Sequence, residues 1–164
     1  MNKDESMKEQ PSTPSVHTVF LGLGTNLGQK EENIRRAIEK IGELVGEVVR
    51  QSALYRSEPW GFQSENSFVN AVICCQTTLT PHEVLVKTQA IERAMGRRHK
   101  SVNRQYHDRI IDIDILLYDD WQVDEPDLQI PHPLMFQRDF VMNPLREILD
   151  FPEEKLPKTN IPCR

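Results

Sequence analysis

Two aspartates, Asp112 and Asp114, could do chemistry because they lie one strand step apart in the segment 104–118, RQYHDRIIDIDILLY. Side chains two residues apart on a strand point to the same side, about 7 Å from each other. Two carboxylates at that distance repel each other by roughly 2.4 kcal/mol at an effective dielectric constant of 20. We therefore expect a cation between them, either a divalent metal ion or a basic side chain such as Arg109 in a plain salt bridge.

The segment just before this pair is strongly basic. It contains two histidines, a single aspartate and the following lysine and arginines: Arg97, Arg98, Lys100, Arg104 and Arg109. A basic segment in a chain with a formal net charge of −5 indicates a local anion site, although a solvated charged loop fits the composition equally well. Arginine binds phosphate oxygens and carboxylates bind magnesium, so the two features together favour a polyphosphate with Mg²⁺.

A flat slot for a ring is the second candidate feature. Its walls would come from four aromatic residues, Trp60, Phe62, Phe68 and Phe140. Asn70 shares a strand face with Phe68, and its amide can pair with one edge of a heterocycle through a donor and an acceptor together. Core packing explains each aromatic residue taken singly, whereas the loop position of Trp60 favours binding.

The apolar pattern predicts the elements that would position these side chains. Strands are predicted at 18–23, 47–56, 67–77 and from 110 onward, and helices at 30–44, 81–95 and about 138–148. In the last of these strands, one face would carry the apolar residues Ile111, Ile113, Ile115 and Leu117, and the other Asp112, Asp114, Leu116 and Tyr118.

The order strand-helix-strand-strand-helix-strand is typical of an α+β, ferredoxin-like fold, here with a C-terminal extension made of a hairpin and a short helix. The first and last strands are antiparallel neighbours in that fold. The end of the first strand, the loop from Ser57 onward and the basic segment would then meet at one rim of the sheet, beside Asp112 and Asp114.

Composition limits the class of protein. A chain of 164 residues with 38% hydrophobic and 27% charged residues predicts one domain. We place this domain at 17–150, between a disordered N-terminal tail at 1–16 and an irregular C-terminal tail at 151–164. The acidic net charge argues against nucleic-acid binding, and the longest apolar runs are too short for a membrane span. Three cysteines without metal or disulfide spacing fit a cytoplasmic protein. Nothing implies an obligate protein partner, and we expect a monomer or a weak dimer.

A series of segments, in their order along the chain, resembles the 6-hydroxymethyl-7,8-dihydropterin pyrophosphokinases (HPPK) of folate biosynthesis. They are LGLGTNLG, YRSEPWGFQSENSFVNAV, TQAIERAMGR, DRIIDIDILLY and IPHPLMFQRDFVMNPLREI, and the resemblance covers residues 18–148. It implies a ferredoxin-like α+β fold and transfer of the diphosphate of ATP to the pterin hydroxymethyl group, with two Mg²⁺ ions. The products would be AMP and the pterin pyrophosphate.

The resemblance also implies a role for individual residues. Metal binding would fall to Asp112 and Asp114, which with Arg97 and Arg109 would form the catalytic set. Pterin contacts would come from Ser57, Trp60, Phe68, Asn70 and Phe140, with the two phenylalanines on either side of the ring. ATP contacts would come from Gln89, Glu92, Arg97, Arg109, Ile115, His132 and Arg138. The chain departs from the family at 106–109, where YHDR stands in place of the usual Trp-Gly-Pro-Arg, and at Glu58, where Pro is common.

Two alternatives from other classes remain at this point. One is a ferredoxin-like module that binds a small ligand without catalysis. The other is a two-metal nuclease or nucleotidyl transferase, against which the overall acidity and the absence of an extended basic stretch count.

Overall fold

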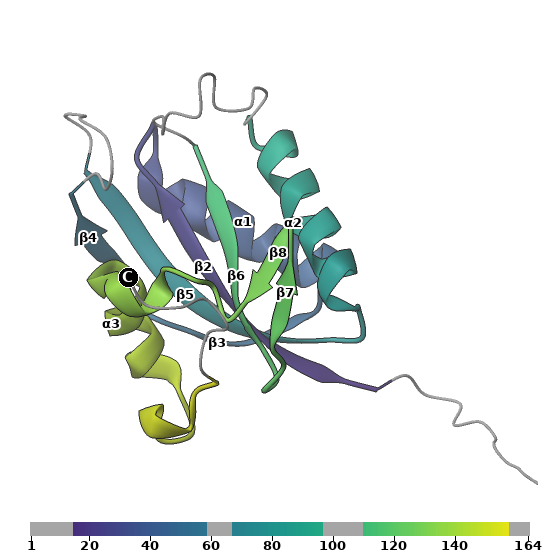
Figure 1. The fold of residues 1–164 in the computed structure, drawn as a ribbon. Coiled ribbons are helices and arrows are strands. Elements are labelled where there is room, and N and C mark those ends of the chain that lie inside the picture. The colour runs from purple at the N-terminus through teal and green to yellow at the C-terminus, as the bar shows by residue number, and fades with distance from the viewer. Residues whose placement is uncertain (1–14, 59–66, 97–109, 158–164) are drawn as a thin grey trace, which may run out of the picture.

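The computed structural model describes residues 15–58, 67–96 and 110–157. Within these residues one five-stranded sheet has the order β3-β5-β2-β6, and β4 also pairs with β5 (Figure 1). Its strands are β2 His17–Thr25, β3 Glu47–Gln51, β4 Tyr55–Ser57, β5 Phe68–Thr77 and β6 Asp112–Tyr118. The pairings of this sheet are antiparallel, and the predicted neighbours β2 and β6 do lie side by side. The chain is thus a mixed α/β protein built on an antiparallel sheet.

Helices cover both faces of the sheet. In the described part of the chain, α1 Lys30–Leu44 and α2 Pro81–Ala94 lie on one face and α3 Asp139–Ile148 lies on the other (Figure 1). Along β2, Leu21 packs with α1 and α2, whereas its neighbour Phe20 packs with α3. Because successive strand residues point to opposite faces, a sheet covered on both sides needs apolar residues at both the odd and the even positions of its strands. All three helices were predicted from the sequence within a residue or two of their observed bounds.

Helix α2 begins with a capping box. The Thr80 hydroxyl accepts a hydrogen bond from the Glu83 backbone N–H at 3.2 Å, and the Glu83 carboxylate accepts one from the Thr80 N–H at 2.8 Å. Pro81 occupies the first helical position, where its missing N–H costs nothing. The helix gives way to Gly96, whose φ of +116° favours glycine. These two ends set where α2 begins and where it stops.

The prediction for the end of β6 was wrong. Ile111, Ile113 and Ile115 do face α1 and α2, but Leu117 packs with α3 and Tyr118 is fully buried on the α1–α2 side. The cause is a bulge: Phe20 pairs with Leu117, and the next β2 residue pairs with Ile115. One extra residue in β6 reverses the facing of everything that follows it. Asp112 and Asp114 precede the bulge and share one face of β6, as predicted.

The prediction of a single strand at 47–56 was also wrong, because the structure has two separate strands there, β3 and β4. At the break, the Ser52 hydroxyl accepts the hydrogen bond of the Val72 N–H at 3.0 Å, taking a place that a ladder carbonyl would fill. The Ala53 N–H turns away from the sheet and donates to the Glu147 carboxylate of α3 at 3.1 Å. Ser57, expected at the start of a loop, therefore lies at the end of β4, opposite Phe68.

The predicted C-terminal extension is present. A hairpin of β7 Val123–Glu125 and β8 Leu128–Ile130 forms a small separate sheet in the described chain, and the 3₁₀ turn η2 Met135–Gln137 leads into α3. After α3, a second 3₁₀ turn, η3 Glu153–Lys155, brings Leu156 into the core under α3. Most of the two predicted tails, residues 1–14 and 158–164, lie outside the described residues.

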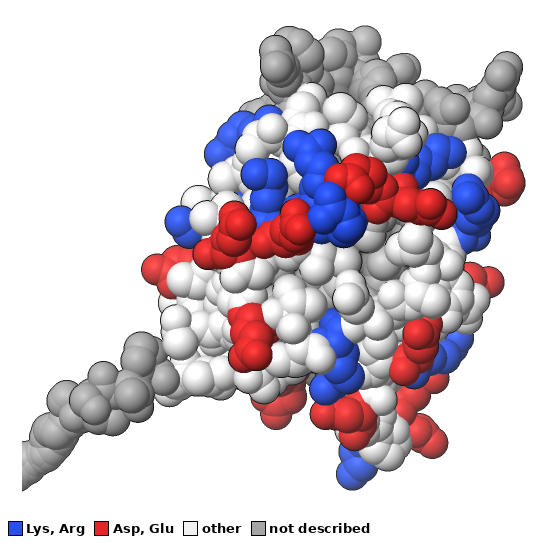
Figure 2. Space-filling view, turned by 180° about the vertical axis from the view of Figure 1, so that it is seen from behind, with Lys and Arg blue, Asp and Glu red and all other residues white. Residues whose placement is uncertain are grey.

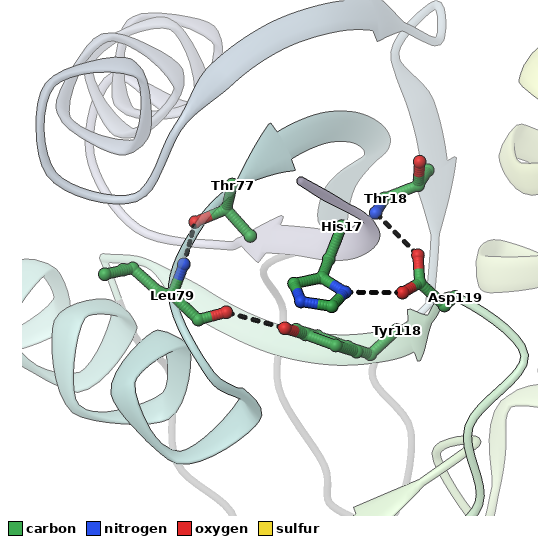
Figure 3. Close-up of polar contacts among 6 residues, drawn as sticks. All are labelled: His17, Thr18, Thr77, Leu79, Tyr118 and Asp119. Carbon is green, nitrogen blue, oxygen red and sulfur yellow. Dashed lines mark hydrogen bonds and ion pairs between the residues drawn. The ribbon is translucent and has the colours of Figure 1, made fainter. Parts of the chain in front are cut away.

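A polar network holds the end of the sheet where β2 begins and β6 ends (Figure 3). The Asp119 carboxylate accepts from the Thr18 N–H at 2.8 Å and lies 2.7 Å from His17 Nδ1. Tyr118 donates its hydroxyl hydrogen to the Leu79 carbonyl at 2.6 Å. Asp119 has a φ of 50°, which is unfavourable for a residue with a side chain, so its two contacts stabilise a turn that the backbone alone disfavours.

The face seen in Figure 2, behind the view of Figure 1, carries acidic and basic side chains intermixed rather than a field of one sign. Arg35 of α1, for example, pairs with both Glu32 and Glu39. This face therefore gives no support to binding of a nucleic-acid backbone. Among the described helices, none combines the length and the apolar character that a membrane crossing requires.

Candidate active site

A pocket opens at the end of the sheet on the face covered by α3. Its floor is made by the paired residues of three neighbouring strands: Gly24 of β2 stands opposite Asn70 of β5 on one side and Asp112 of β6 on the other, and Gly22 stands opposite Asp114. Directly paired residues of a sheet share a face. The two glycines leave this floor without side chains, so that space remains between the carboxylates and the amide.

The pocket collects residues that are far apart in the sequence. Seven residues assigned from the sequence line it: Ser57, Phe68, Asn70, Asp112, Asp114, Arg138 and Phe140. Others that line it were not assigned a role: Gly22, Leu23, Gly24, Glu58, Ala71, Val72 and Val141. Val72 could have been found from the sequence, because it shares the face of Phe68 and Asn70 on one strand. Val141 could not, since only tertiary packing brings α3 over this face.

The side-chain amide of Asn70 is held in one orientation. Asn70 is 4% exposed, and its Nδ2 donates to the Ser57 hydroxyl at 2.8 Å and to the Tyr55 carbonyl at 3.3 Å. The amide oxygen lies on the side of Gly24, where an added Cβ would stand 3.1 Å from it. We expected this amide to offer a donor and an acceptor together; in the structure, its NH₂ group is bound by β4.

Arg138 and Phe140 form the wall contributed by the start of α3. The guanidinium carbon of Arg138 lies 5.5 Å from the centre of the Phe140 ring, within the range of a cation–π contact. Both side chains are half-buried and line the pocket opposite the β6 carboxylates. The lining of the pocket thus combines two aromatic rings, Phe68 and Phe140, with charged groups of both signs.

His132 is held neutral next to these charged groups. Burial, together with the nearby Arg138 charge, lowers its pKa to about 4, while Asp112 acts weakly in the other direction. Its Nδ1 accepts a hydrogen bond from the Leu134 N–H at 3.2 Å. A neutral imidazole with an accepting Nδ1 carries its proton on Nε2, so His132 offers one N–H donor at neutral pH.

Glu92 supports the β6 carboxylates from the other face of the sheet. It projects from α2, is 7% exposed, and its Oε2 accepts the Ile113 backbone N–H at 2.7 Å. Ile113 is the residue between Asp112 and Asp114. A buried carboxylate that accepts a backbone hydrogen bond fixes that peptide firmly, so Glu92 sets the position of the strand on which both aspartates stand.

Four described residues assigned to ATP do not line the pocket: His132 and Glu92, described above, and Gln89 and Ile115. Gln89 is exposed on α2, and the Ile115 side chain is buried in the core on the α1–α2 face. Trp60, Phe62, Arg97 and Arg109, with the rest of the basic segment, lie outside the described residues, so their predicted roles stay predictions.

Comparison with known proteins identifies the family. The model of the 7,8-dihydro-6-hydroxymethylpterin-pyrophosphokinase (HPPK) family matches residues 20–150. The chain belongs to this family. A relative from Porphyromonas gingivalis, named 2-amino-4-hydroxy-6-hydroxymethyldihydropteridine pyrophosphokinase, is 44% identical over 144 residues, which are 87% of this chain and 98% of the relative. A protein of the same name from Aquifex aeolicus is 41% identical over 131 residues, 80% of this chain and 79% of the relative.

Solved structures agree on the HPPK fold. The crystal structure of wild-type Plasmodium falciparum HPPK-DHPS with SDX-DHP superimposes with a TM-score of 0.69 at 16% identity, covering 91% of this chain. The chain corresponds to only 44% of that longer protein. At this identity the similarity concerns the fold alone.

Proposed function

We propose that the pocket at the end of β2, β5 and β6 is the place where this chain carries out the reaction of its family. The chain transfers a diphosphate group from ATP to 6-hydroxymethyl-7,8-dihydropterin in folate biosynthesis, as its family and the names of its relatives indicate. The observation that supports this site best is the convergence of seven residues, assigned one by one from the sequence, on one pocket. The family match and the named relatives disfavour both alternatives, a ligand-binding module without catalysis and a nuclease.

Asp112 and Asp114 suit the magnesium ions that accompany ATP. Their carboxylates share one face of β6, line the pocket and are half-buried, and hard oxygen donors of this kind are those that Mg²⁺ prefers. We propose that these two residues hold two ions. When bound, magnesium would offset the charge of the triphosphate and make the pterin hydroxyl a better nucleophile.

The residues around the carboxylates would place the phosphates. Arg138 projects into the pocket and can pair with phosphate oxygens, and the Nε2–H of His132 can donate to one of them without adding a charge. The resemblance assigns Arg97 and Arg109 to the same task. Positioning of this kind supplies most of the catalysis in phosphoryl-type transfer, because the barrier depends on alignment and charge rather than on a strong base.

The aromatic rings of the pocket would hold the pterin. We propose that the ring lies between Phe68 and Phe140 while the Asn70 amide contacts its edge, which turns the hydroxymethyl group toward the carboxylates. Offset stacking against two phenyl rings contributes about 0.5–1.5 kcal/mol per pair beyond the area buried. The resemblance adds Trp60 and Ser57 to this contact set.

Three broader expectations accompany this function. The sheet order β3-β5-β2-β6, with helices between its strands, supports the ferredoxin-like arrangement. We propose action in the cytoplasm, which the use of ATP supports and with which the free thiols of Cys74 and Cys75 are compatible. We propose that the chain acts as a monomer or a weak dimer without an obligate protein partner.

Product analysis tests the function. The purified chain is incubated with Mg-ATP, with and without 6-hydroxymethyl-7,8-dihydropterin, and the nucleotide products are separated by chromatography. We expect AMP and the pterin diphosphate in equal amounts, and only when the pterin is present. Formation of ADP, or of AMP at the same rate without pterin, would exclude the proposed reaction.

A further inference from the structure

The orientation of the Asn70 amide depends on β4, a strand that the sequence did not separate from β3. β4 lies beside β5 (Figure 1), and in this pairing Tyr55 stands opposite Asn70 and Ser57 opposite Phe68. The Tyr55 carbonyl can only accept a hydrogen bond, so the amide group that faces it must be the NH₂. The Ser57 hydroxyl, at the shorter distance of 2.8 Å, takes the other hydrogen.

The other end of the same amide therefore faces the pocket floor. Asn70 Oδ1 lies beside Gly24, and both residues line the pocket. Because NH₂ has two hydrogens and each has an acceptor on β4, a ligand lying on this floor meets a carbonyl oxygen. That oxygen can pair with an N–H on a ring edge but repels a ring nitrogen or carbonyl that carries a lone pair.

We propose that Ser57 is a positioning residue that selects the ligand through Asn70. Its hydroxyl keeps the amide oxygen, rather than the NH₂, toward the ligand, and the pocket thereby selects a heterocycle whose edge presents an N–H donor. This inference rests on the proposed function, because it takes the pocket to be the pterin site. It gives Ser57 a role that does not require its own contact with the substrate.

The test compares Ser57→Ala with Ser57→Thr. Alanine leaves one amide hydrogen without an acceptor, so that the longer bond to the Tyr55 carbonyl, at 3.3 Å, alone opposes rotation of the amide. Threonine keeps the hydroxyl, and its branched side chain is favourable in a strand. Ser52→Ala is the matched control, because the Ser52 hydroxyl also bonds to β5, at the Val72 N–H, but does not line the pocket.

Steady-state kinetics are measured with 6-hydroxymethyl-7,8-dihydropterin and with its 2-desamino analogue, which lacks the amino donor of the ring edge. For Ser57→Ala we expect KM for the pterin to rise about three- to tenfold with kcat changed less, the effect of one neutral hydrogen bond. The preference for the pterin over the analogue should fall in parallel. Ser57→Thr should keep both values near those of the unsubstituted chain, and Ser52→Ala should change neither.

Two results would overturn the inference. One is a Ser57→Ala variant with the original KM and the original preference; the other is a Ser57→Thr variant as impaired as Ser57→Ala, since that would assign the effect to packing. Thermal unfolding of each variant shows whether it is folded. If the unsubstituted chain itself did not convert the pterin, the proposed function would fail instead, so the two failures are distinguishable.

Discussion

Removal of the Glu92 carboxylate should weaken both the fold and the reaction, because this side chain holds β6 between the two aspartates. In Glu92→Ala the Ile113 N–H, now bonded at 2.7 Å, remains buried without its acceptor. An unsatisfied buried donor costs about 1–3 kcal/mol. For a chain of this size that loss lowers the Tm by between about 2 and 12 °C. Glu92→Gln is the matched control, since the amide oxygen can still accept the hydrogen bond, and it should lose less than half as much.

The effect on turnover follows from the same geometry. Asp112 and Asp114 flank Ile113, so a displacement of this peptide moves both carboxylates, and a misplacement of about 1 Å can cost on the order of a hundredfold in rate. We expect kcat of Glu92→Ala to fall by between about ten- and a hundredfold, together with a weaker dependence on magnesium. The assay combines calorimetric unfolding without any ligand with AMP release at saturating ATP.

The resemblance gave Glu92 a different role, contact with ATP, and the two roles predict different results. A residue that only contacts the nucleotide would leave the Tm of the ligand-free chain unchanged and raise KM for ATP. An unchanged Tm in Glu92→Ala would therefore refute the anchoring role of Glu92 derived from its bond to Ile113.

Three further predictions concern other parts of the chain. Asp112→Asn or Asp114→Asn should lower turnover by on the order of a hundredfold or more and abolish the stabilisation by Mg-ATP, while circular dichroism shows an intact fold; a chain that fails to fold would instead make the pair structural. The fold lowers the pKa of His132 to about 4, so the unfolded chain binds a proton at this residue more readily than the folded chain does. The free energy of unfolding should therefore be full above pH 6.5 and fall by at most about 3 kcal/mol as the pH drops from 6.5 toward 4. Urea denaturation at pH 7 and pH 4.5 should show this loss, and His132→Gln should reduce it. Asp119→Ala should lower the free energy of unfolding by about 1–3 kcal/mol, because it removes two contacts at a residue with a φ of 50°. Asp119→Asn should lower it less, and neither variant should alter KM for the pterin; equal losses of stability in both variants would contradict this explanation.

The part of the site that lies on strands could be predicted from the sequence, because strand parity is a local property. Asp112 and Asp114 share a face by their spacing alone, and Phe68 and Asn70 do so for the same reason. Antiparallel pairing of the first and last strands followed from the order of the elements, and it brings these two pairs together on either side of β2.

What could not be predicted depends on contacts between distant segments. The bulge at Leu116 reverses the last residues of β6, and the sequence around it contains no glycine or proline to mark it. The break between β3 and β4 arises from the Ser52 hydroxyl and from Glu147, which is about a hundred residues away in the sequence and reaches back to the Ala53 N–H. The hydrogen bond between Glu92 and β6 could not be predicted for the same reason, because it joins distant segments and a glutamate on a helix is ordinarily solvent-exposed.

The central claim is that one pocket holds magnesium on two neighbouring aspartates and a pterin ring between two phenylalanines. A crystal structure with Mg²⁺, a non-hydrolysable ATP analogue and 6-hydroxymethyl-7,8-dihydropterin measures this directly. We predict metal density within about 2.0–2.1 Å of carboxylate oxygens of both Asp112 and Asp114, and the pterin ring stacked between Phe68 and Phe140. A pterin bound elsewhere, or metal bound without either aspartate, would contradict the account.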